Sequence, residues 1–200
     1  GRAGERLGQH GALELVGAGS MEPNAPFSLH YAYFSEGPAE LFEMTTMIEV
    51  DSEATSAGIF VRYGEEGEDT LFVGRYGLSS VRSVASDGEV IEWENDPQKP
   101  VYLKITWTAQ SGIVYLSEGN EVWEELTILS FDNAGPESVG LGVYSDDGGL
   151  TSAVFSELVL RDANGVEILN DPHGWSGGGM GGENQSPPNP APPGNPGGSG

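Results

Sequence analysis

Hydrophobic and polar residues alternate with a period of two through most of this 200-residue chain. The clearest run is 101–107, where Val101, Leu103, Ile105 and Trp107 share one parity. Such alternation is typical of a strand with one face on a core and the other in water. Similar runs occupy residues 13–15, 27–33, 41–50, 59–63, 71–73, 139–143 and 153–160. No amphipathic helix of three turns is predicted between them.

Turn residues separate these runs, as expected of short strands joined by tight connections. Asp87-Gly88 and Ser111-Gly112 are two examples. Asn164-Gly165 predicts a two-residue hairpin between 158–161 and 166–169. Ten to twelve short strands without helices predict an all-β fold, either an antiparallel sandwich or a barrel.

Composition changes sharply near residue 175. The last 25 residues hold nine glycines and six prolines, and Met180 is their one sizeable apolar side chain. Such a segment cannot bury enough apolar surface to fold alone, and its proline-rich half favours polyproline II geometry. We therefore predict a flexible lead-in over 1–10, a sandwich over 11–175 and a disordered or polyproline II tail over 176–200.

The chain is strongly acidic, with 31 acidic and 8 basic residues and a net charge of −23. This charge is repelled by phosphate backbones and anionic lipid, so nucleic-acid binding is not expected. Membrane insertion is not expected either, because no apolar run approaches the roughly 18 residues of a spanning helix. The chain contains no cysteine, which excludes disulfides and thiolate metal sites. An acidic, cysteine-free chain fits a secreted protein, so we expect an extracellular or cell-surface location.

Six segments carry a family resemblance when they are read in order. They are 11–19, 42–50, 57–62, 101–105 with Ser117 and Trp123, 139–143 and 153–160. Together they resemble the concanavalin A-like jelly-roll superfamily of lectins and glucanases, and within it bacterial laminin-G-like and DUF1349-like modules. The resemblance covers about residues 11–161 and implies an antiparallel jelly-roll β-sandwich. It also implies an extracellular binding or adhesive module with carbohydrate as its ligand.

One acidic run has the spacing of a catalytic motif. Glu49, Asp51 and Glu53 resemble the E-x-D-x-E signature of retaining glucanases that share this sandwich, where the first Glu attacks the sugar and the last is the acid/base. On one strand the outer Cα atoms would lie about 13 Å apart, whereas retaining enzymes need carboxylates roughly 5–5.5 Å apart. Because the apolar parity ends at Val50, and Ser52 replaces the next apolar residue, we interpret the run as an acidic loop. We predict that the protein is not an enzyme; a retaining β-glucanase using Glu49 and Glu53 is the alternative hypothesis.

Aromatic side chains are the candidates for carbohydrate binding, because sugars bind on aromatic platforms flanked by polar groups. Four of them are predicted to contact the ligand: Trp93, Tyr63, Tyr76 and Tyr144. Trp107 shares the parity of its apolar neighbours and is expected in the core. Trp123, at the end of a predicted hairpin, is also expected to pack.

Acidic residues on one turn are the candidates for a metal site. Asp146 and Asp147 precede two glycines, and Ca²⁺ is the cation that carboxylate and carbonyl oxygens suit. The spacing does not match a calcium-binding loop, so no cofactor is required by the sequence.

The tail suggests a role in assembly. Polyproline II segments keep unpaired backbone groups and dock into grooves of other subunits. We predict a homo-oligomer or an extracellular filament whose subunits are linked through this tail. Its anchoring residues would be Trp175, Met180, Pro187, Pro188, Pro192 and Pro193. A linker to a lost anchor or a further domain is the alternative.

Overall fold

The computed structural model describes ten stretches of the chain. They are residues 4–7, 12–18, 29–34, 42–64, 69–85, 87, 89–131, 135–145, 147–167 and 175–180. These stretches consist of strands and turns, and they contain no helix long and apolar enough to cross a membrane.

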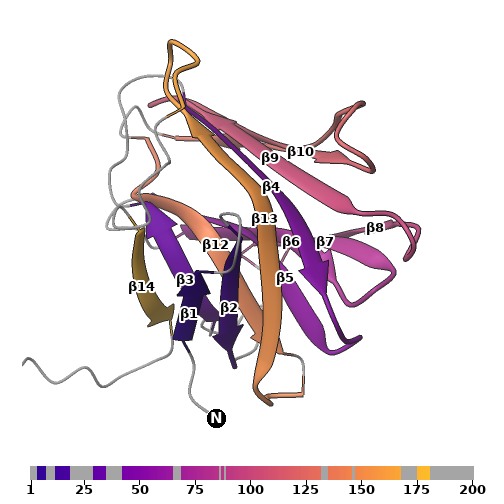
Figure 1. Cartoon of the computed structure of the whole chain (residues 1–200). Helices are drawn as coiled ribbons and strands as arrows, with labels where there is room; N and C mark the ends of the chain where they lie inside the picture. The colour runs from indigo at the N-terminus through magenta and orange to yellow at the C-terminus, as the bar shows by residue number, and fades with distance from the viewer. Residues whose placement is uncertain are drawn as a thin grey trace, which may run out of the picture.

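Two antiparallel sheets face each other and form a sandwich (Figure 1). Sheet A has the order β1-β2-β13-β4-β9-β10-β11, and sheet B has the order β14-β3-β12-β5-β6-β7-β8. The strands of sheet A are β1 (Gly4–Leu7), β2 (Leu13–Gly17), β13 (Thr151–Arg161), β4 (Phe42–Val50), β9 (Val101–Trp107), β10 (Ser111–Ser117) and β11 (Glu124–Ser130). The strands of sheet B are β14 (Trp175–Met180), β3 (Leu29–Phe34), β12 (Ser138–Ser145), β5 (Thr55–Tyr63), β6 (Asp69–Tyr76), β7 (Ser80–Ala85) and β8 (Val90–Glu94). The prediction of an antiparallel jelly-roll sandwich is confirmed.

The core forms between the sheets from the residues that alternate along each strand. In β9, Val101, Leu103 and Ile105 are fully buried, and Trp107 at the end of the strand is 1% exposed. The Trp107 ring stacks on Phe42 of β4 at a centroid distance of 5.6 Å. The expectation that Trp107 belongs to the core is confirmed, and the opposite face of β9 is therefore turned away from sheet B.

Strands β5 and β6 approach each other closely at a pair of glycines in the centre of sheet B. Gly58 lies opposite Gly74 in the register of the two strands. A Cβ added to Gly58 would lie 2.2 Å from the carbonyl oxygen of Val73 and 2.3 Å from the Cα of Gly74. Both atoms belong to the backbone, so a side chain at residue 58 would force the two strands apart.

The structure adds a strand at each end of the chain, outside the strands predicted from the sequence. The lead-in contains β1, which pairs with β2, and the predicted tail begins inside β14, which pairs with β3. Trp175 lies opposite Phe34 and Met180 opposite Leu29, so the backbone of both predicted anchors is paired within the same chain. Short segments gain order by adding to the edge of an existing sheet, which local composition does not reveal.

The proline-rich part of the tail lies outside the described residues. Pro187, Pro188, Pro192 and Pro193 belong to it, so assembly through these prolines stays a prediction.

A turn forms at Asn164-Gly165, but it is not the predicted two-residue connection. The Asp162 N–H donates to the carbonyl oxygen of Val166, and the Gly165 N–H donates to that of Asp162, both at 2.9 Å, so three residues, 163–165, make the turn. Arg161 pairs with Glu167 across the turn. The Asp162 carboxylate accepts hydrogen bonds from the backbone N–H groups of Asn164 and Val166, both at 2.9 Å. The turn is therefore organised from the Asp162 side chain.

Candidate functional site

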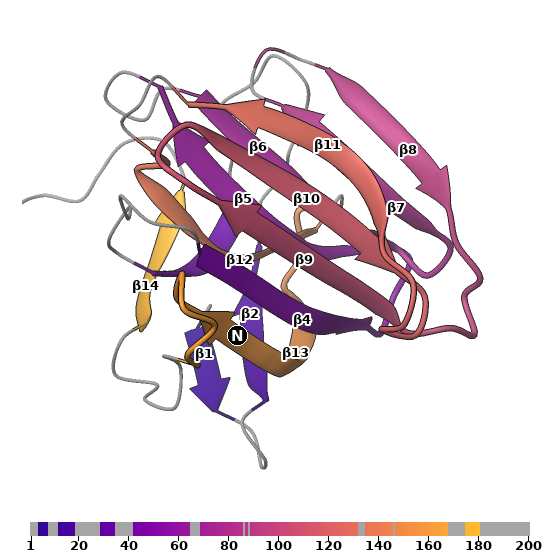
Figure 2. The same cartoon turned by 90° about the horizontal axis from the view of Figure 1, so that it is seen from above.

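The outer face of sheet A carries aromatic side chains. Because Leu103 and Ile105 point into the core, Tyr102 and Lys104 of β9 point to the opposite face. Tyr115 of β10 lies directly opposite Lys104 in the register and shares this face. In Figure 2, β4, β9 and β10 lie nearest the viewer, and no other described element lies in front of them. No other described strand therefore covers the backbone of this face.

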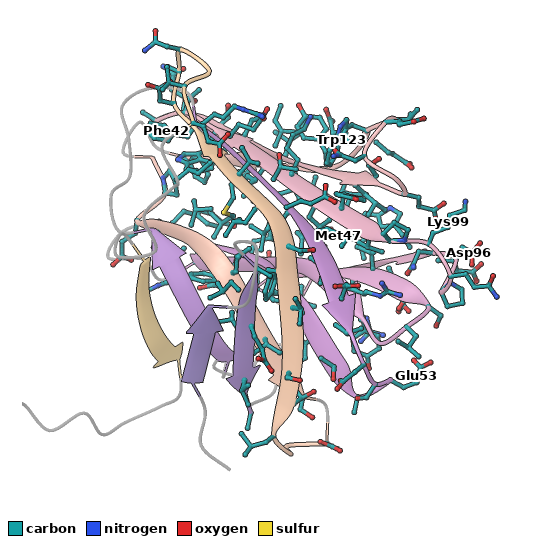
Figure 3. All side chains as sticks on the ribbon, in the orientation of Figure 1. Phe42, Met47, Glu53, Asp96, Lys99 and Trp123 are labelled. Atoms are coloured by element: carbon teal, nitrogen blue, oxygen red, sulfur yellow. The ribbon has the colours of Figure 1, made fainter. Side chains whose placement is uncertain are left out.

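Trp123 joins this face from the connection between β10 and β11. The Lys104 ammonium lies 4.3 Å from the centroid of the Trp123 ring and 4.8 Å from that of Tyr115. Figure 3 shows Trp123 on the side of sheet A that faces away from sheet B. Tyr115 and Trp123 are called the aromatic platform below, and the cation–π contacts of Lys104 tie these two rings together. Tyr102 shares this face but is only 8% exposed, so it borders the platform as a buried neighbour.

A carboxylate borders the platform at Tyr102. The Tyr102 hydroxyl donates a hydrogen bond to Oε1 of Glu157 at 3.2 Å. Burial raises the pKa of Tyr102, and the negative charges of Glu157 and Glu49 raise it further. The phenol therefore stays protonated near neutral pH and keeps donating this hydrogen bond.

The backbone of Glu157 has a conformation that favours glycine. Its φ is 50°, in the left-handed region, and the register of β13 with β4 shifts between Ser156 and Val159. On the β4 side, Thr46 Oγ1 donates a hydrogen bond to the carbonyl oxygen of Ser156 at 3.2 Å. Backbone strain of this kind concentrates at functional sites, and here it accompanies a carboxylate that borders the platform.

Two substitutions at Glu157 separate the hydrogen bond from the backbone strain. Glu157→Ala removes the hydrogen bond but keeps a Cβ in the left-handed conformation, whereas Glu157→Gly removes both. We expect the glycine variant to be more stable than the alanine variant by about 1 kcal/mol, because L-residues pay that penalty and glycine does not. Urea unfolding of the two variants measures the difference. An alanine variant as stable as the glycine variant would show that the bulge is unstrained.

Two of the four aromatic residues predicted from the sequence pack against the core instead of forming a platform. Trp93 of β8 lies opposite the buried Val81 and is half-buried. Tyr63 of β5 is also half-buried, and its ring meets that of Phe131 edge-on at a centroid distance of 5.7 Å. Each of these rings therefore stabilises the sandwich from sheet B and is not part of the outer face of sheet A.

The other two belong to sheet B and are also separate from the platform. Tyr144 is 2% exposed and meets Phe72 edge-on at 5.3 Å, so its ring is not accessible to a sugar. Tyr76 is covered by the guanidinium of Arg82, whose carbon lies 3.4 Å from the ring centroid. The structure does not bring the four predicted residues together into one site.

The acidic run does not form a converging set of carboxylates on one strand. β4 ends at Val50, and residues 51–54 form a turn. The Glu53 carboxylate accepts a hydrogen bond from the backbone N–H of Leu78 at 3.1 Å. Figure 3 shows Glu53 well separated from Trp123. The structure therefore gives Glu53 a structural partner, and it does not favour a glucanase centre built on Glu49 and Glu53.

The predicted calcium ligands are only partly visible. Asp146 lies outside the described residues. Asp147 accepts hydrogen bonds from the Ser145 hydroxyl and the backbone N–H of Gly149, and these bonds lower its pKa. Among the described residues, no group of three or more acidic or histidine side chains is arranged to hold a metal ion. Calcium binding at this turn stays a prediction.

Alternation along the chain predicts this face only in part. Tyr102 and Lys104 have the parity opposite to that of the predicted core residues of the same strand, so the alternation does mark them as outward-facing. Trp123 is half-buried over Lys104, so it packs as expected, but it packs on the outer face of sheet A. It lies in a connection, where alternation gives no direction.

The comparisons with known proteins support the fold. No protein-family model matches the chain, and no curated protein matches it in sequence. Among solved structures, GH43B of a Bacteroides ovatus xyloglucan locus is 18% identical with a TM-score of 0.57, covering 79% of this chain and 34% of its own. A xylan β-1,4-xylosidase from Bacillus halodurans is 17% identical with a TM-score of 0.55, covering 76% of this chain and 33% of its own. A Saccharomyces cerevisiae protein of unknown function is 12% identical with a TM-score of 0.54, covering 80% of this chain and 96% of its own.

These similarities overturn the prediction that the protein is not an enzyme. The xylosidase and two GH43 proteins contain a sandwich of this fold. The lack of a convincing E-x-D-x-E motif therefore does not exclude a glycan-processing enzyme, and that argument from the sequence was wrong. The resemblance to concanavalin A-like folds holds for the β-sandwich, while the DUF1349-like and laminin-G-like assignment stays a prediction.

Proposed function

We propose that this chain is the polysaccharide-binding sandwich of a glycan-degrading protein, and that the aromatic platform is its binding surface. The observation that carries the proposal is the pair of half-buried rings of Tyr115 and Trp123, held by Lys104 on the outer face of sheet A beside the buried Tyr102. Aromatic rings offer a large apolar area to the non-polar faces of sugar rings at a small cost in side-chain entropy.

Polar groups around the platform suit the hydroxyl groups of a sugar. The Glu157 carboxylate has acceptor capacity beyond the one hydrogen bond from Tyr102. Met47 of β4 lies opposite Tyr102. Glu49 is exposed and lies two residues further along β4 on the same face. Apolar rings bordered by carboxylates are the combination that sugar binding needs, because carboxylates accept hydrogen bonds from hydroxyl groups.

The comparisons support a carbohydrate-related role for this sandwich as one domain of a larger protein. The sandwich spans 33% and 34% of the two bacterial enzyme chains to which it is similar. We infer that it serves within a protein that degrades plant-type polysaccharide, where it holds the polymer. An extracellular location, where such polymers occur, is part of the same proposal.

Affinity electrophoresis of the full chain tests this proposal. The protein is run in native gels that contain xylan, xyloglucan or no polysaccharide, with serum albumin as the non-binding control. We expect retardation by at least one of the two polymers. Release of reducing sugar, measured on the same polymers, shows whether the chain also cleaves what it binds. Mobility equal to the polymer-free gel in both polymers would contradict the proposed function.

A further inference from the structure

The basic residues of this protein have distinct partners, and Lys104 differs from the others. Six lysine and arginine side chains are described. Four form ion pairs: Arg62 with Glu137, Arg82 with Glu92, Lys99 with Glu118, and Arg161 with Glu43. The fifth, Arg75, is 5% exposed and donates to the carbonyl oxygen of Leu78 at 3.0 Å. Within the described part of the chain, Lys104 has neither an ion pair nor a hydrogen bond, and its ammonium instead lies over two aromatic rings.

This arrangement is unexpected in a protein with 31 acidic residues. Carboxylates outnumber cations almost four to one, so an exposed lysine normally finds one. Tyr115 and Trp123 instead hold the ammonium by the electrostatics of their ring faces. An ammonium group has three N–H donors, and contacts with ring faces do not satisfy them with strong hydrogen bonds. The Lys104 donors therefore remain available at the platform.

We propose that Lys104 binds a carboxylate carried by the polysaccharide, so that the platform recognises a glycan bearing uronic acid substituents. The inference rests on the proposed function of the platform and names the class of its ligand. A carboxylate supplies the negative charge and the acceptor oxygens that Lys104 lacks within the protein. A positive charge placed between two rings also selects a charged sugar over its neutral counterpart.

The charge of the rest of the protein defines this ligand further. The net charge of −23 repels a polyanion. Glu157 and Glu49 are negative groups near Tyr102, on the same face as Lys104. A polymer of uronic acid would place several carboxylates against these groups. A neutral backbone with isolated uronic acid substituents meets the single cation without that repulsion.

The test compares one polymer with and without its carboxylates. Binding of the full chain to glucuronoxylan and to the same glucuronoxylan after carboxyl reduction is measured by affinity electrophoresis at low salt. We expect native glucuronoxylan to bind about three- to fivefold more tightly, the range of an exposed ion pair. The preference is expected to persist in Lys104→Arg and to disappear in Lys104→Met. Polygalacturonate, a polyanion, is expected to bind more weakly than native glucuronoxylan.

Each outcome distinguishes the two proposals. Equal affinity of the unmodified protein for the native and reduced polymers would overturn the role of Lys104 and leave the platform in place. A preference that survives in Lys104→Met would overturn it as well, because another cation would be responsible. Tighter binding of polygalacturonate than of native glucuronoxylan would contradict the proposal that the ligand carries isolated uronic acid substituents. Binding to neither form of glucuronoxylan would count against the proposed function itself.

Discussion

Replacing Trp123 with alanine is expected to weaken polysaccharide binding by about 30-fold, which corresponds to about 2 kcal/mol. Trp123 supplies the larger ring of the platform, and its contact with Lys104 also positions that cation. Large aromatic side chains at the centre of a binding surface contribute most of its affinity. Dissociation constants from affinity electrophoresis measure the change.

A matched control for this substitution is Trp93→Phe. Trp93 packs against the core at the edge of sheet B, and phenylalanine retains an aromatic ring there. We expect Trp93→Phe to bind polysaccharide with unchanged affinity. Far-ultraviolet circular dichroism confirms that both variants keep their strands. Loss of binding in Trp93→Phe with normal binding in Trp123→Ala would contradict the platform and place the binding site on sheet B.

Gly58→Ala is expected to destabilise the protein by about 3 kcal/mol or more, at the upper end of overpacking effects. The new Cβ would lie 2.2 Å from the Val73 carbonyl oxygen, which cannot move without breaking the pairing of β5 with β6. For a domain of this size the melting temperature is expected to fall by about 6–12 °C. Thermal and urea unfolding measure the effect.

Gly112→Ala provides the comparison for Gly58→Ala. A Cβ at Gly112 would lie 3.1 Å from the ring of Phe131, a side chain that can shift. We expect Gly112→Ala to cost much less than Gly58→Ala. Similar stabilities of the two variants would show that β5 and β6 are not held at the observed distance.

The fold follows from the sequence where alternation is strong, and is missed where a strand lies at an edge. β9 alternates cleanly, so both its core residues and its outward residues can be assigned. β8 and β11 are edge strands with mostly exposed side chains, and their patterns do not separate an inner from an outer face. β1 and β14 depend on pairing with another strand, which local composition does not encode.

The candidate site was harder to predict because its residues meet through register and a bulge. Tyr115 lies opposite Lys104 only because of the pairing of β9 with β10. The left-handed conformation at Glu157 has no glycine to mark it in the sequence. Tyr144 looked available as an outward residue, but every residue of β12 is buried, so alternation carries no information about exposure there.

The most direct test of the platform observes the tryptophan side chains during binding. Indole N–H resonances of ¹⁵N-tryptophan-labelled protein are assigned with single Trp→Phe variants and followed during titration with oligosaccharides from the polymer that retards the protein. We expect the Trp123 resonance to shift saturably, while the resonance of Trp107, which is 1% exposed, stays in place. A saturable shift of Trp93 with an unchanged Trp123 would contradict the proposed binding surface.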